Sequence, residues 1–240
     1  MTGNDGTRKK VGSSIAECFP ESLVRKLAGS LSTEASAESA VPSYTNSNPA
    51  IRWLMFRRLE VIRKIALTTL ERGGTRTGRA ALDFGCGIGM MIPALSASVE
   101  TLYLCDEQLT PARATAQWFN ARNVVCLPPD ELEGGIEDSG LDVVIAADVL
   151  EHVDYLATVV ETLRRKLRPQ GVLIVSGPTE SRAYRCGRWI AGFSGDYHMR
   201  SVYEVEGGVQ KARFACERLL KLPFALGPTL FRITLWRRGD

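Results

Sequence analysis

The sequence predicts a doubly wound α/β fold, with a mostly parallel seven-stranded sheet and an antiparallel hairpin at its C-terminal end. Two observations predict the parallel part. Short apolar segments alternate with helical ones between residues 79 and 176, and the first apolar segment ends in alternating glycines. A third observation predicts the hairpin, because the chain ends in two extended segments around a tight turn. Parallel strands need crossovers, and the helices in those crossovers cover both faces of the sheet.

Residues 1–47 are predicted to form an N-terminal extension or lid, flexible or partly helical. Ser, Thr, Ala, Glu and Gly dominate this stretch. One short helix is indicated by apolar residues at helical spacing, namely Phe19, Leu23, Val24 and Leu27. The stretch from Gly29 to Asn48 is typical of a flexible connector. Residues 48–240 are predicted to be one domain, with residues 178–213 as an insertion on the substrate side.

A long helix is predicted to begin at Asn48-Pro49, where a capping side chain precedes a proline at the first helical position. It ends before Gly73. Its cations are Arg52, Arg57, Arg58, Arg63 and Lys64. We interpret it as a helix that covers the sheet and exposes a solvated cationic face. The alternative is a basic, aromatic helix that rests on an anionic membrane.

The alternating region supplies the remaining elements in order. Strands are predicted at residues 79–84, 101–105, 123–127, 141–146 and 171–176, and helices at 90–96, 111–120 and 156–167. The segment at 141–146 is apolar on both faces, as a central parallel strand should be. The final hairpin is predicted from residues 216–224 and 230–236, with Leu226-Gly227-Pro228 between them.

Composition excludes several classes of protein. The chain of 240 residues is 45% hydrophobic, enough for a full core, and its formal charge of +3 is too small to indicate nucleic acid. No apolar run approaches the roughly 18 residues of a membrane span, and no apolar block of a signal peptide follows Lys10. We therefore expect a cytoplasmic protein. Six cysteines without a C-x-x-C pair and only two histidines predict reduced thiols and no metal site.

The most informative motif is Asp83-Phe84-Gly85-Cys86-Gly87-Ile88-Gly89. Alternating glycines after a buried strand let the backbone approach a ligand closely, at the edge where open α/β sheets bind ligands. Met90 stands where a dinucleotide fingerprint requires glycine, and no lysine follows, as a triphosphate loop requires. Asp106 ends the next strand, 21 residues after Gly85, where a carboxylate can accept both ribose hydroxyls. The motif therefore predicts a nucleoside ligand without a pyrophosphate.

This set of features resembles the class I S-adenosylmethionine-dependent methyltransferases, and is most similar to the broad group that acts on small molecules, quinones and lipids. The resemblance covers roughly Asn48 to the end and implies a Rossmann-like fold. Residues 141–153, ending in "VLEHV", resemble the family's fourth motif. Residues 163–176, "LRRKLRPQGVLIVS", resemble its following helix, Pro-x-Gly turn and fifth strand. The C-terminal hairpin resembles its sixth and seventh strands.

The resemblance implies a role for each residue of the cofactor site. Gly85, Gly87 and Gly89 would pack against the methionine part of S-adenosylmethionine, with Cys86 as a small residue within the loop. Asp83 would hold that loop and orient the cofactor's amino group, and Asp106 would bind the ribose. Glu107 or Gln108 would lie beside the adenine, whose amine Asp130 would bind after Pro128-Pro129. Ala147 and Asp148 would line the floor near the sulfonium.

The predicted insertion is the candidate acceptor site. Tyr184, Arg185 and Arg188 are assigned to substrate binding, because aromatic and arginine side chains suit an anionic or partly apolar molecule. The alternative is an ordinary surface loop. His198, with Tyr197, is the candidate catalytic pair, since a hydroxyl acceptor would need a base. His152 and Glu151 are interpreted as structural, the first bonded to backbone and the second as a helix N-terminal carboxylate.

The resemblance implies a methyltransferase that moves a methyl group to a small-molecule or lipid-like acceptor by in-line displacement. Two alternatives stay open. A nicotinamide-dependent oxidoreductase would use the same layered fold, although Met90 argues against it. A non-catalytic partner could keep the fold as an interaction module. Ala146-Ala147-Asp148-Val149 replaces the Asn-Pro-Pro-Tyr type of sequence found in amino-methylating nucleic-acid enzymes. No nucleic-acid partner is therefore expected, and peripheral membrane contact is left open.

Overall fold

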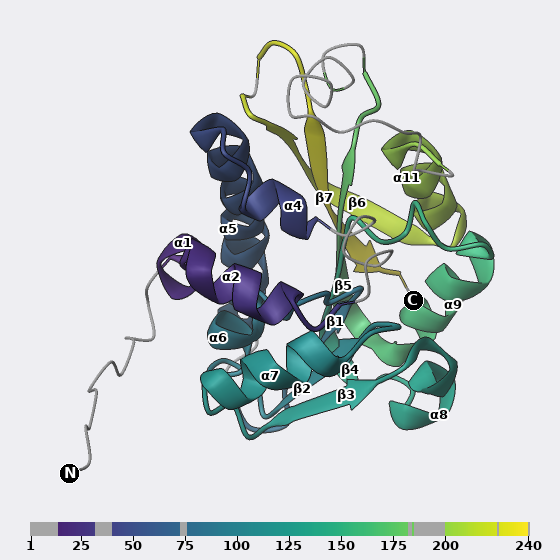
Figure 1. The fold of residues 1–240 in the computed structure, drawn as a ribbon. Coiled ribbons are helices and arrows are strands. Elements are labelled where there is room, and N and C mark those ends of the chain that lie inside the picture. Colours follow the sequence, from purple (N-terminus) through teal and green to yellow (C-terminus); the bar gives the residue numbers. More distant parts are fainter. Residues whose placement is uncertain are drawn as a thin grey trace.

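The structure, a computed structural model, describes residues 14–31, 40–72, 76–181, 184, 200–224 and 226–239. It contains a seven-stranded sheet in the order β3-β2-β1-β4-β5-β7-β6 (Figure 1). The strands are β1 Ala80–Phe84, β2 Thr101–Cys105, β3 Val124–Leu127, β4 Leu141–Ala147, β5 Leu167–Pro178, β6 Phe214–Leu222 and β7 Phe231–Arg238. The strands β1 to β5 pair in parallel, and β7 runs antiparallel to both β5 and β6. The predicted fold class is confirmed.

The strand order places the ligand edge of the sheet. The strand β1 lies between β2 and β4, so the chain reverses its direction of winding at this point. In open α/β sheets the ligand crevice lies at such a switch point, outside the carboxyl ends of the strands. All five residues of β1 are buried, which fixes the start of the loop that follows Phe84. The loops after β1, β2 and β4 therefore surround one opening.

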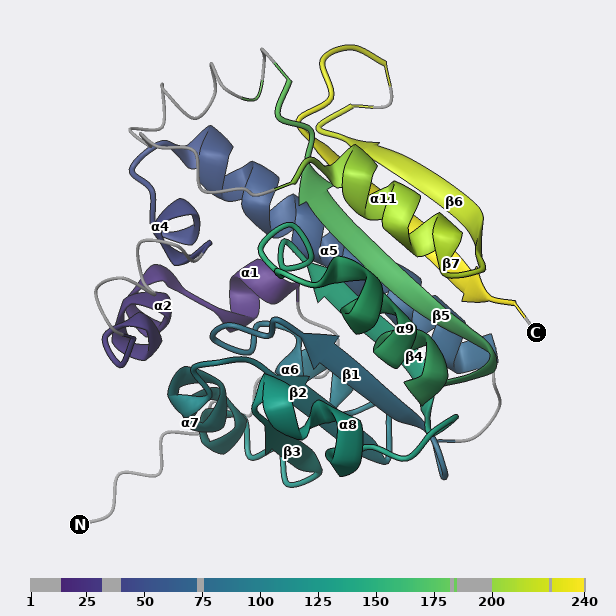
Figure 2. The ribbon, with the colours of Figure 1, turned by 90° about the vertical axis from the view of Figure 1, so that its right-hand side faces the viewer.

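Helices cover both faces of the sheet (Figures 1 and 2). They are α1 Ile15–Cys18, α2 Glu21–Ala28, α4 Val41–Tyr44, α5 Pro49–Arg72, α6 Ile92–Leu95, α7 Thr110–Trp118, the 3-10 helix η1 Pro129–Glu131, α8 Leu132–Gly135, α9 Leu156–Lys166 and α11 Val202–Lys211. One core cluster joins one face of the sheet to α1, α2, α4, α5 and α6, and a second joins the other face to α9 and α11. The helices of these two clusters turn their apolar sides toward the core and their polar sides toward solvent, as expected for amphipathic helices.

The described part of the N-terminal extension is helical and packed. Ser14 and Glu17 form a capping box that starts α1. Phe19 and Val24 are fully buried in the same core cluster as α5, and Phe19 lies 5.4 Å from the Phe119 ring after α7. The segment between residues 32 and 39 lies outside the described residues. The helices that precede α5 therefore form part of the cover over one face of the sheet.

The interval assigned to the substrate-side insertion contains a helix that was not predicted. The helix α11 begins at a capping box formed by Ser201 and Glu204. Val202, Val205 and Val209 are buried, and α11 packs against α9, β5 and β6. Part of the interval therefore covers the second core cluster. The Ser-x-x-Glu spacing before an apolar repeat was the available signal.

Candidate functional site

The glycine loop between β1 and α6 depends on two close approaches. Gly85 has φ +73°, and a Cβ atom placed on it would lie 2.5 Å from the Val149 side chain. A Cβ atom on Gly89 would lie 2.5 Å from Ile92 Cδ1. The Gly85 and Cys86 amides both donate to the Cys105 carbonyl at the end of β2, at 2.8 and 3.2 Å. The loop is thus held between the turn after β4 and the end of β2.

Gly87, at the centre of the loop, faces open space. Its φ is +52°, and nothing lies within 4 Å of the position that a Cβ atom would take. This backbone conformation is most often adopted by glycine, because a side chain in it causes steric strain. The bare backbone at Gly87 therefore leaves room for a ligand to approach, as the sequence predicts.

Asp106 lies directly beside this open backbone. Its Oδ2 accepts a hydrogen bond from the Gly87 amide at 2.8 Å, and its Oδ1 accepts one from the Gln108 amide at 3.1 Å. The residue is half-buried, so its carboxylate also faces solvent. Two amide donors orient the carboxylate, and its other lone pairs can accept hydroxyl groups from a ligand. The structure thus brings Gly87 and Asp106 together from two strands.

Asp83, the last-but-one residue of β1, is a buried carboxyl with an altered titration. It is 4% exposed. Burial, with a smaller contribution from the Asp106 charge, raises the pKa of Asp83 to about 7. Because burial without a cation disfavours the charged form, the arrival of an ammonium group would favour ionisation of Asp83. The site therefore offers one carboxylate for hydroxyl groups and a second carboxyl suited to a cation.

The other predicted cofactor residues differ in their surroundings. Cys86 is buried, and burial followed by the Asp83 charge raises the pKa of its thiol well above the usual value. A protonated thiol is a poor nucleophile, so Cys86 acts as a small packing residue. Glu107 and Asp130 are exposed. Asp130 lies within electrostatic reach of Cys105, at the end of β2, and its contact with adenine stays a prediction.

Asp148 follows β4 in an unusual conformation. Its φ is +54°, which is uncommon for a residue other than glycine. Its amide donates to the Ser176 carbonyl at 2.9 Å, and the Ser176 hydroxyl donates to Asp148 Oδ1 at 3.4 Å. Ala147, just before it, is half-buried against the α5 core cluster. The carboxylate of Asp148 forms an ion pair with Arg58 of α5.

The burial of Arg58 is an exception to the predicted solvated cationic face of α5, on which Arg57 and Lys64 are exposed. Arg58 is 1% exposed, and its Nη2 donates to the Tyr44 hydroxyl at 3.1 Å. Its guanidinium lies 4.9 Å from the centre of the Phe231 ring. Met55, Arg58 and Ile62 share one side of the helix, and this 3.6-residue spacing was the signal that sequence reasoning missed. A cation on the apolar stripe of a helix requires a partner in the core.

Glu151 also differs from its prediction as a helix N-terminal carboxylate. It lies in the turn after β4, whereas α9 begins only at Leu156. The residue is 2% exposed, so it is a buried carboxyl. Burial raises the pKa of Glu151 to about 7, while the Arg58 charge lowers this pKa and the Glu180 charge raises it. His152, the next residue, is exposed on the same turn.

Most of the predicted acceptor site lies outside the described residues. This holds for Arg185, Arg188, Tyr197 and His198. Tyr184 is described and half-buried, with its ring edge-on to Phe231 at 5.5 Å. Its amide donates to the Ser181 hydroxyl at 3.2 Å. Tyr184 therefore shares the Phe231 ring with Arg58.

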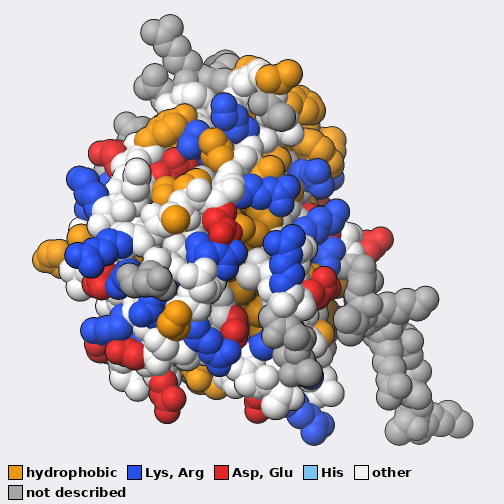
Figure 3. Space-filling model, turned by 180° about the vertical axis from the view of Figure 1, so that it is seen from behind, with side chains coloured by type: hydrophobic (Ala, Val, Ile, Leu, Met, Phe, Trp, Pro, Cys, Tyr) orange, Lys and Arg blue, Asp and Glu red, His pale blue; other side chains and the backbone are white. Residues whose placement is uncertain are grey.

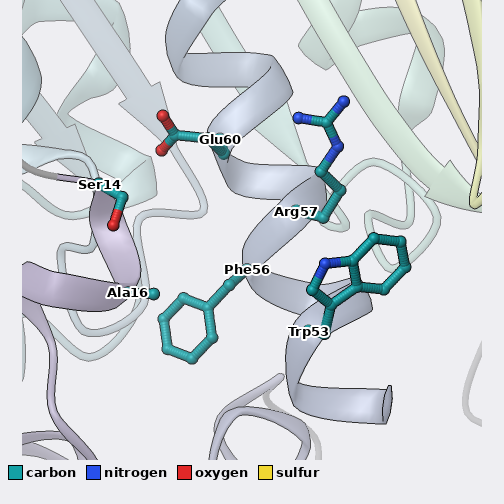
Figure 4. A pocket seen from close by; sticks show the side chains of 6 residues that line it. All are labelled: Ser14, Ala16, Trp53, Phe56, Arg57 and Glu60. Atoms are coloured by element: carbon teal, nitrogen blue, oxygen red, sulfur yellow. The ribbon is translucent and has the colours of Figure 1, made fainter. Parts of the chain in front are cut away.

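A small pocket of about 270 Å³ lies on a different part of α5. It is lined by Ser14, Ala16, Trp53, Phe56, Arg57 and Glu60 (Figure 4). None of these residues belongs to the glycine loop or to the turn after β4. Within the described residues, no three His, Cys, Asp or Glu side chains are grouped as a metal site would require. No helix of that part of the chain has the length and hydropathy of a membrane span.

The sequence is similar to a family model and to curated proteins. Residues 82–175, less than half of the chain, match the family model described as a methyltransferase domain. The ubiquinone biosynthesis O-methyltransferase of Acinetobacter baumannii (strain AYE) is 30% identical over 128 residues, which cover 50% of this chain and 53% of the relative. The protein of the same description from Neisseria meningitidis serogroup A is 25% identical over 127 residues, with the same coverage of both chains. The chain thus spans about half the length of the curated relatives it matches.

Solved structures share the fold at low sequence identity. An S-adenosylmethionine-dependent methyltransferase from Aquifex aeolicus has a TM-score of 0.57 at 18% identity, over 92% of this chain and 99% of that one. Magnesium protoporphyrin IX methyltransferase from Synechocystis PCC 6803 has a TM-score of 0.60 at 19% identity, over 91% and 94%. These likenesses concern the fold alone. Residues 82–175 thus match a methyltransferase domain, and the solved methyltransferases share the fold of the chain.

Proposed function

We propose that the protein binds S-adenosylmethionine and transfers its methyl group to a hydroxyl of a small-molecule or lipid-like acceptor. The observation that carries the proposal is the open backbone at Gly87, bordered by the Asp106 carboxylate. When bound, S-adenosylmethionine supplies a methyl group that the positive charge on sulfur has already activated. The protein must then hold the acceptor in line with that methyl group and exclude water.

The residues around the opening fit this cofactor. Asp106 can accept the two ribose hydroxyls, since the Gly87 and Gln108 amides use only part of its hydrogen-bonding capacity. Asp83 suits the ammonium of the methionine part, because a cation offsets the burial that keeps this carboxyl protonated. Met90 is buried where a dinucleotide fold needs glycine. This favours S-adenosylmethionine over the nicotinamide alternative.

The choice of a hydroxyl acceptor rests on the curated relatives, whose descriptions name O-methylation in ubiquinone biosynthesis. The half-buried ring of Tyr184, which packs edge-on against the buried Phe231, suits an aromatic ring in the acceptor. We place the reaction in the cytoplasm, because the thiols of Cys86, Cys105 and Cys126, which form no disulfide, suit a reducing compartment.

Calorimetry tests the cofactor. Titration with S-adenosylmethionine, and separately with S-adenosylhomocysteine, should show binding at one site. Asp106→Ala should weaken binding by about 100-fold, the equivalent of two hydrogen bonds to a charged group at roughly 1.5 kcal/mol each. Glu137→Ala, an exposed carboxylate away from the site, is the matched control. Wild-type protein that binds a nicotinamide dinucleotide instead would establish the alternative.

A transfer assay tests the acceptor. The protein is incubated with methyl-labelled S-adenosylmethionine and a panel of phenols, catechols and short-chain hydroquinones, with matched anilines and benzoic acids as controls. Label should move only to the hydroxyl compounds. Transfer confined to the amines would overturn the choice of a hydroxyl. Binding of the cofactor without transfer to any compound would support a non-catalytic partner.

We also propose that the edge of the sheet contacts anionic membrane, which would suit a lipid-like acceptor. The far side of the molecule in the view of Figure 1, where β6 lies, carries many Lys and Arg side chains with hydrophobic ones among and above them (Figure 3). On β6 the exposed residues include Arg218, Leu219 and Lys221. Phe224 and Leu226, just after β6, are 64% and 89% exposed. Basic and apolar groups side by side are complementary to an anionic lipid surface.

The alternative is that the charged side chains of the edge strand β6 only prevent it from pairing with a strand of another molecule. Vesicle flotation distinguishes the two. The protein should float with phosphatidylglycerol vesicles and not with phosphatidylcholine vesicles. The double variant Phe224→Ser and Leu226→Ser should lose flotation. Equal recovery with both kinds of vesicle, or none with either, would contradict the proposal.

A further inference from the structure

A polar cluster lies at the carboxyl end of β4, and it includes Asp148, which the resemblance assigns to the cofactor site. It consists of Arg58 of α5 with Asp148 and Glu151 of the turn after β4, and we call it the β4 cluster. Arg58 and Glu151 are 1% and 2% exposed. Arg58 is ion-paired with Asp148, and its charge acts on Glu151. Ions buried to this degree require a structural or functional reason.

The position of Arg58 is fixed from several directions. Asp148 pairs with its guanidinium, the Tyr44 hydroxyl accepts from its Nη2 and the Phe231 ring packs on its face. Asp148 is itself fixed by its amide and side-chain contacts with Ser176. A side chain anchored in this way presents its other N–H groups, the Nε–H of Arg58 among them, in constant directions.

Two buried atoms of the β4 cluster have neither a hydrogen bond nor an ion pair among the described residues, whereas Arg58 Nη1, which also lacks a hydrogen bond, is ion-paired with Asp148. In the part of the chain that the structure describes, neither Arg58 Nε nor Glu151 Oε1 has a hydrogen bond. Buried polar atoms are almost always hydrogen-bonded, so unpaired ones in a native protein call for an explanation. One atom is a donor and the other is an acceptor. A hydroxyl group, which accepts and donates at one oxygen, can serve both.

The β4 cluster lies next to the cofactor loop. Val149, between Asp148 and Glu151, contacts Gly85 so closely that a Cβ atom on Gly85 would lie 2.5 Å from its side chain. The Glu151 carboxyl in turn lies close to Gly177 near the end of β5. The same turn thus touches the glycine loop and carries the buried carboxyl. The β4 cluster therefore borders the loop that we propose holds the cofactor.

We propose that Arg58 and Glu151 bind the hydroxyl of the methyl acceptor, with Arg58 Nε–H donating to its oxygen and Glu151 acting as the base that accepts its proton. This proposal rests on the proposed function and deepens it. The acceptor oxygen forms a bond to the methyl carbon, and the carbon–sulfur bond breaks with its electron pair left on sulfur. The hydroxyl proton moves to the Glu151 carboxylate. The products are the methyl ether, S-adenosylhomocysteine and protonated Glu151.

The surroundings of Glu151 suit this role. Its pKa of about 7 reflects burial, which is opposed first by a hydrogen bond from its own backbone and then by the Arg58 charge, and is reinforced by Glu180. A base with a pKa near the working pH combines a useful ionised fraction with adequate basicity. Asp148 cannot serve in its place, since its carboxylate is committed to Arg58. Arg58 therefore has two effects, since it orients the hydroxyl and keeps Glu151 partly ionised.

The variants Glu151→Gln and Arg58→Lys test the proposal with the hydroxyl acceptor found in the panel. Glu151→Gln keeps the shape and removes the base, so the single-turnover rate should fall by at least 100-fold, with S-adenosylhomocysteine affinity unchanged. Arg58→Lys keeps the charge and removes the fixed Nε–H, so the acceptor KM should rise. The matched controls are Glu161→Gln on the exposed side of α9 and Arg72→Met at the end of α5.

The pH profile provides a readout that a structural role would not change. For wild-type protein the rate should rise with pH through about 7, as Glu151 ionises. Glu151→Gln should remove this rise from any residual rate. A Glu151→Gln protein that transfers methyl at the wild-type rate, or a wild-type rate that is flat across pH 7, would overturn the proposal.

Two further outcomes are separated by design. If Glu151→Gln does not bind S-adenosylhomocysteine, Glu151→Asp and the wild-type pH profile decide instead. Failure of the proposed function appears in wild-type protein, as the absence of transfer to every hydroxyl compound. Failure of the present proposal appears only in the variants, which would then transfer at wild-type rates.

Discussion

The two sides of the ligand opening are built in different ways. On one side, the glycine loop and Asp106 come from β1 and β2 and meet through backbone amides. On the other side, Arg58 reaches Asp148 across 90 residues of sequence, and side chains make the contact. The first side is held by local backbone geometry, and the second by the packing of α5 on the sheet. The side that we propose binds the cofactor is therefore encoded in a short motif, whereas the side that we propose binds the acceptor depends on long-range assembly.

Arg58→Met should be the most damaging test of the second side. It removes the buried cation that pairs with the half-buried Asp148 carboxylate, and breaking a buried ion pair typically costs about 3–5 kcal/mol. The free energy of unfolding, measured by urea denaturation, should fall by that amount. Arg72→Met, an exposed cation of the same helix, should stay within about 0.5 kcal/mol of wild type. Equal losses in the two variants would show that the ion pair with Asp148 contributes little.

Gly85→Ala should be the most damaging test of the first side. The new Cβ atom would lie 2.5 Å from Val149 in a backbone with φ +73°. Overpacking and left-handed strain together cost about 3 kcal/mol. Gly87→Ala provides the contrast, because its Cβ atom meets nothing within 4 Å. Gly87→Ala should lose only about 1 kcal/mol of stability, yet most of its affinity for S-adenosylmethionine by calorimetry. Retained affinity would argue against a ligand over Gly87.

Asp83→Asn should reveal the buried carboxyl through pH. Its folded pKa of about 7 lies above the ordinary value of 3.8. The folded state therefore binds this proton more tightly than the unfolded state does. The contribution of Asp83 to the free energy of unfolding is fully present below about pH 4 and is lost as pH rises through 7. Asn mimics the protonated form at every pH, so Asp83→Asn should be more stable than wild type at pH 8 by at least about 2 kcal/mol, and equal to it at pH 4. Thermal melts at both values check this. Identical melts at pH 8 would contradict the raised pKa.

Tyr44→Phe should have the smallest effect on stability. It tests the hydrogen bond that orients Arg58 without changing the charge of Arg58. It removes the hydrogen bond from Arg58 Nη2 and leaves the ion pair with Asp148. The expected loss is about 1 kcal/mol in urea denaturation. The pH profile of methyl transfer should keep its rise near pH 7, since the charge near Glu151 is unchanged. A shift of that rise would show that Tyr44 also controls the ionisation of Glu151.

Periodicity and motif spacing predicted the strands within a few residues, the antiparallel hairpin and the meeting of Asp106 with the glycine loop. Each of these depends on residues close in sequence or on a known strand-to-strand arrangement. The helix α11 was not predicted, although Ser201 and Glu204 mark its start, because residues 178–213 were interpreted as a substrate-side insertion. Arg58 was placed among solvated cations. Its neighbours on the apolar stripe indicated otherwise, but they do not name the partner that a buried arginine needs.

Local sequence was sufficient for the parallel sheet, the glycine loop and the carboxylate beside it, since backbone conformation and alternating burial follow from residues near one another in the chain. It could not determine the β4 cluster. Whether Arg58, Asp148 and Glu151 are buried, which of them pair and which carboxyl keeps its proton near pH 7 depend on distances between segments far apart in the chain. Electrostatic interactions and desolvation act through space, so only the packing of α5 against β4 determined them.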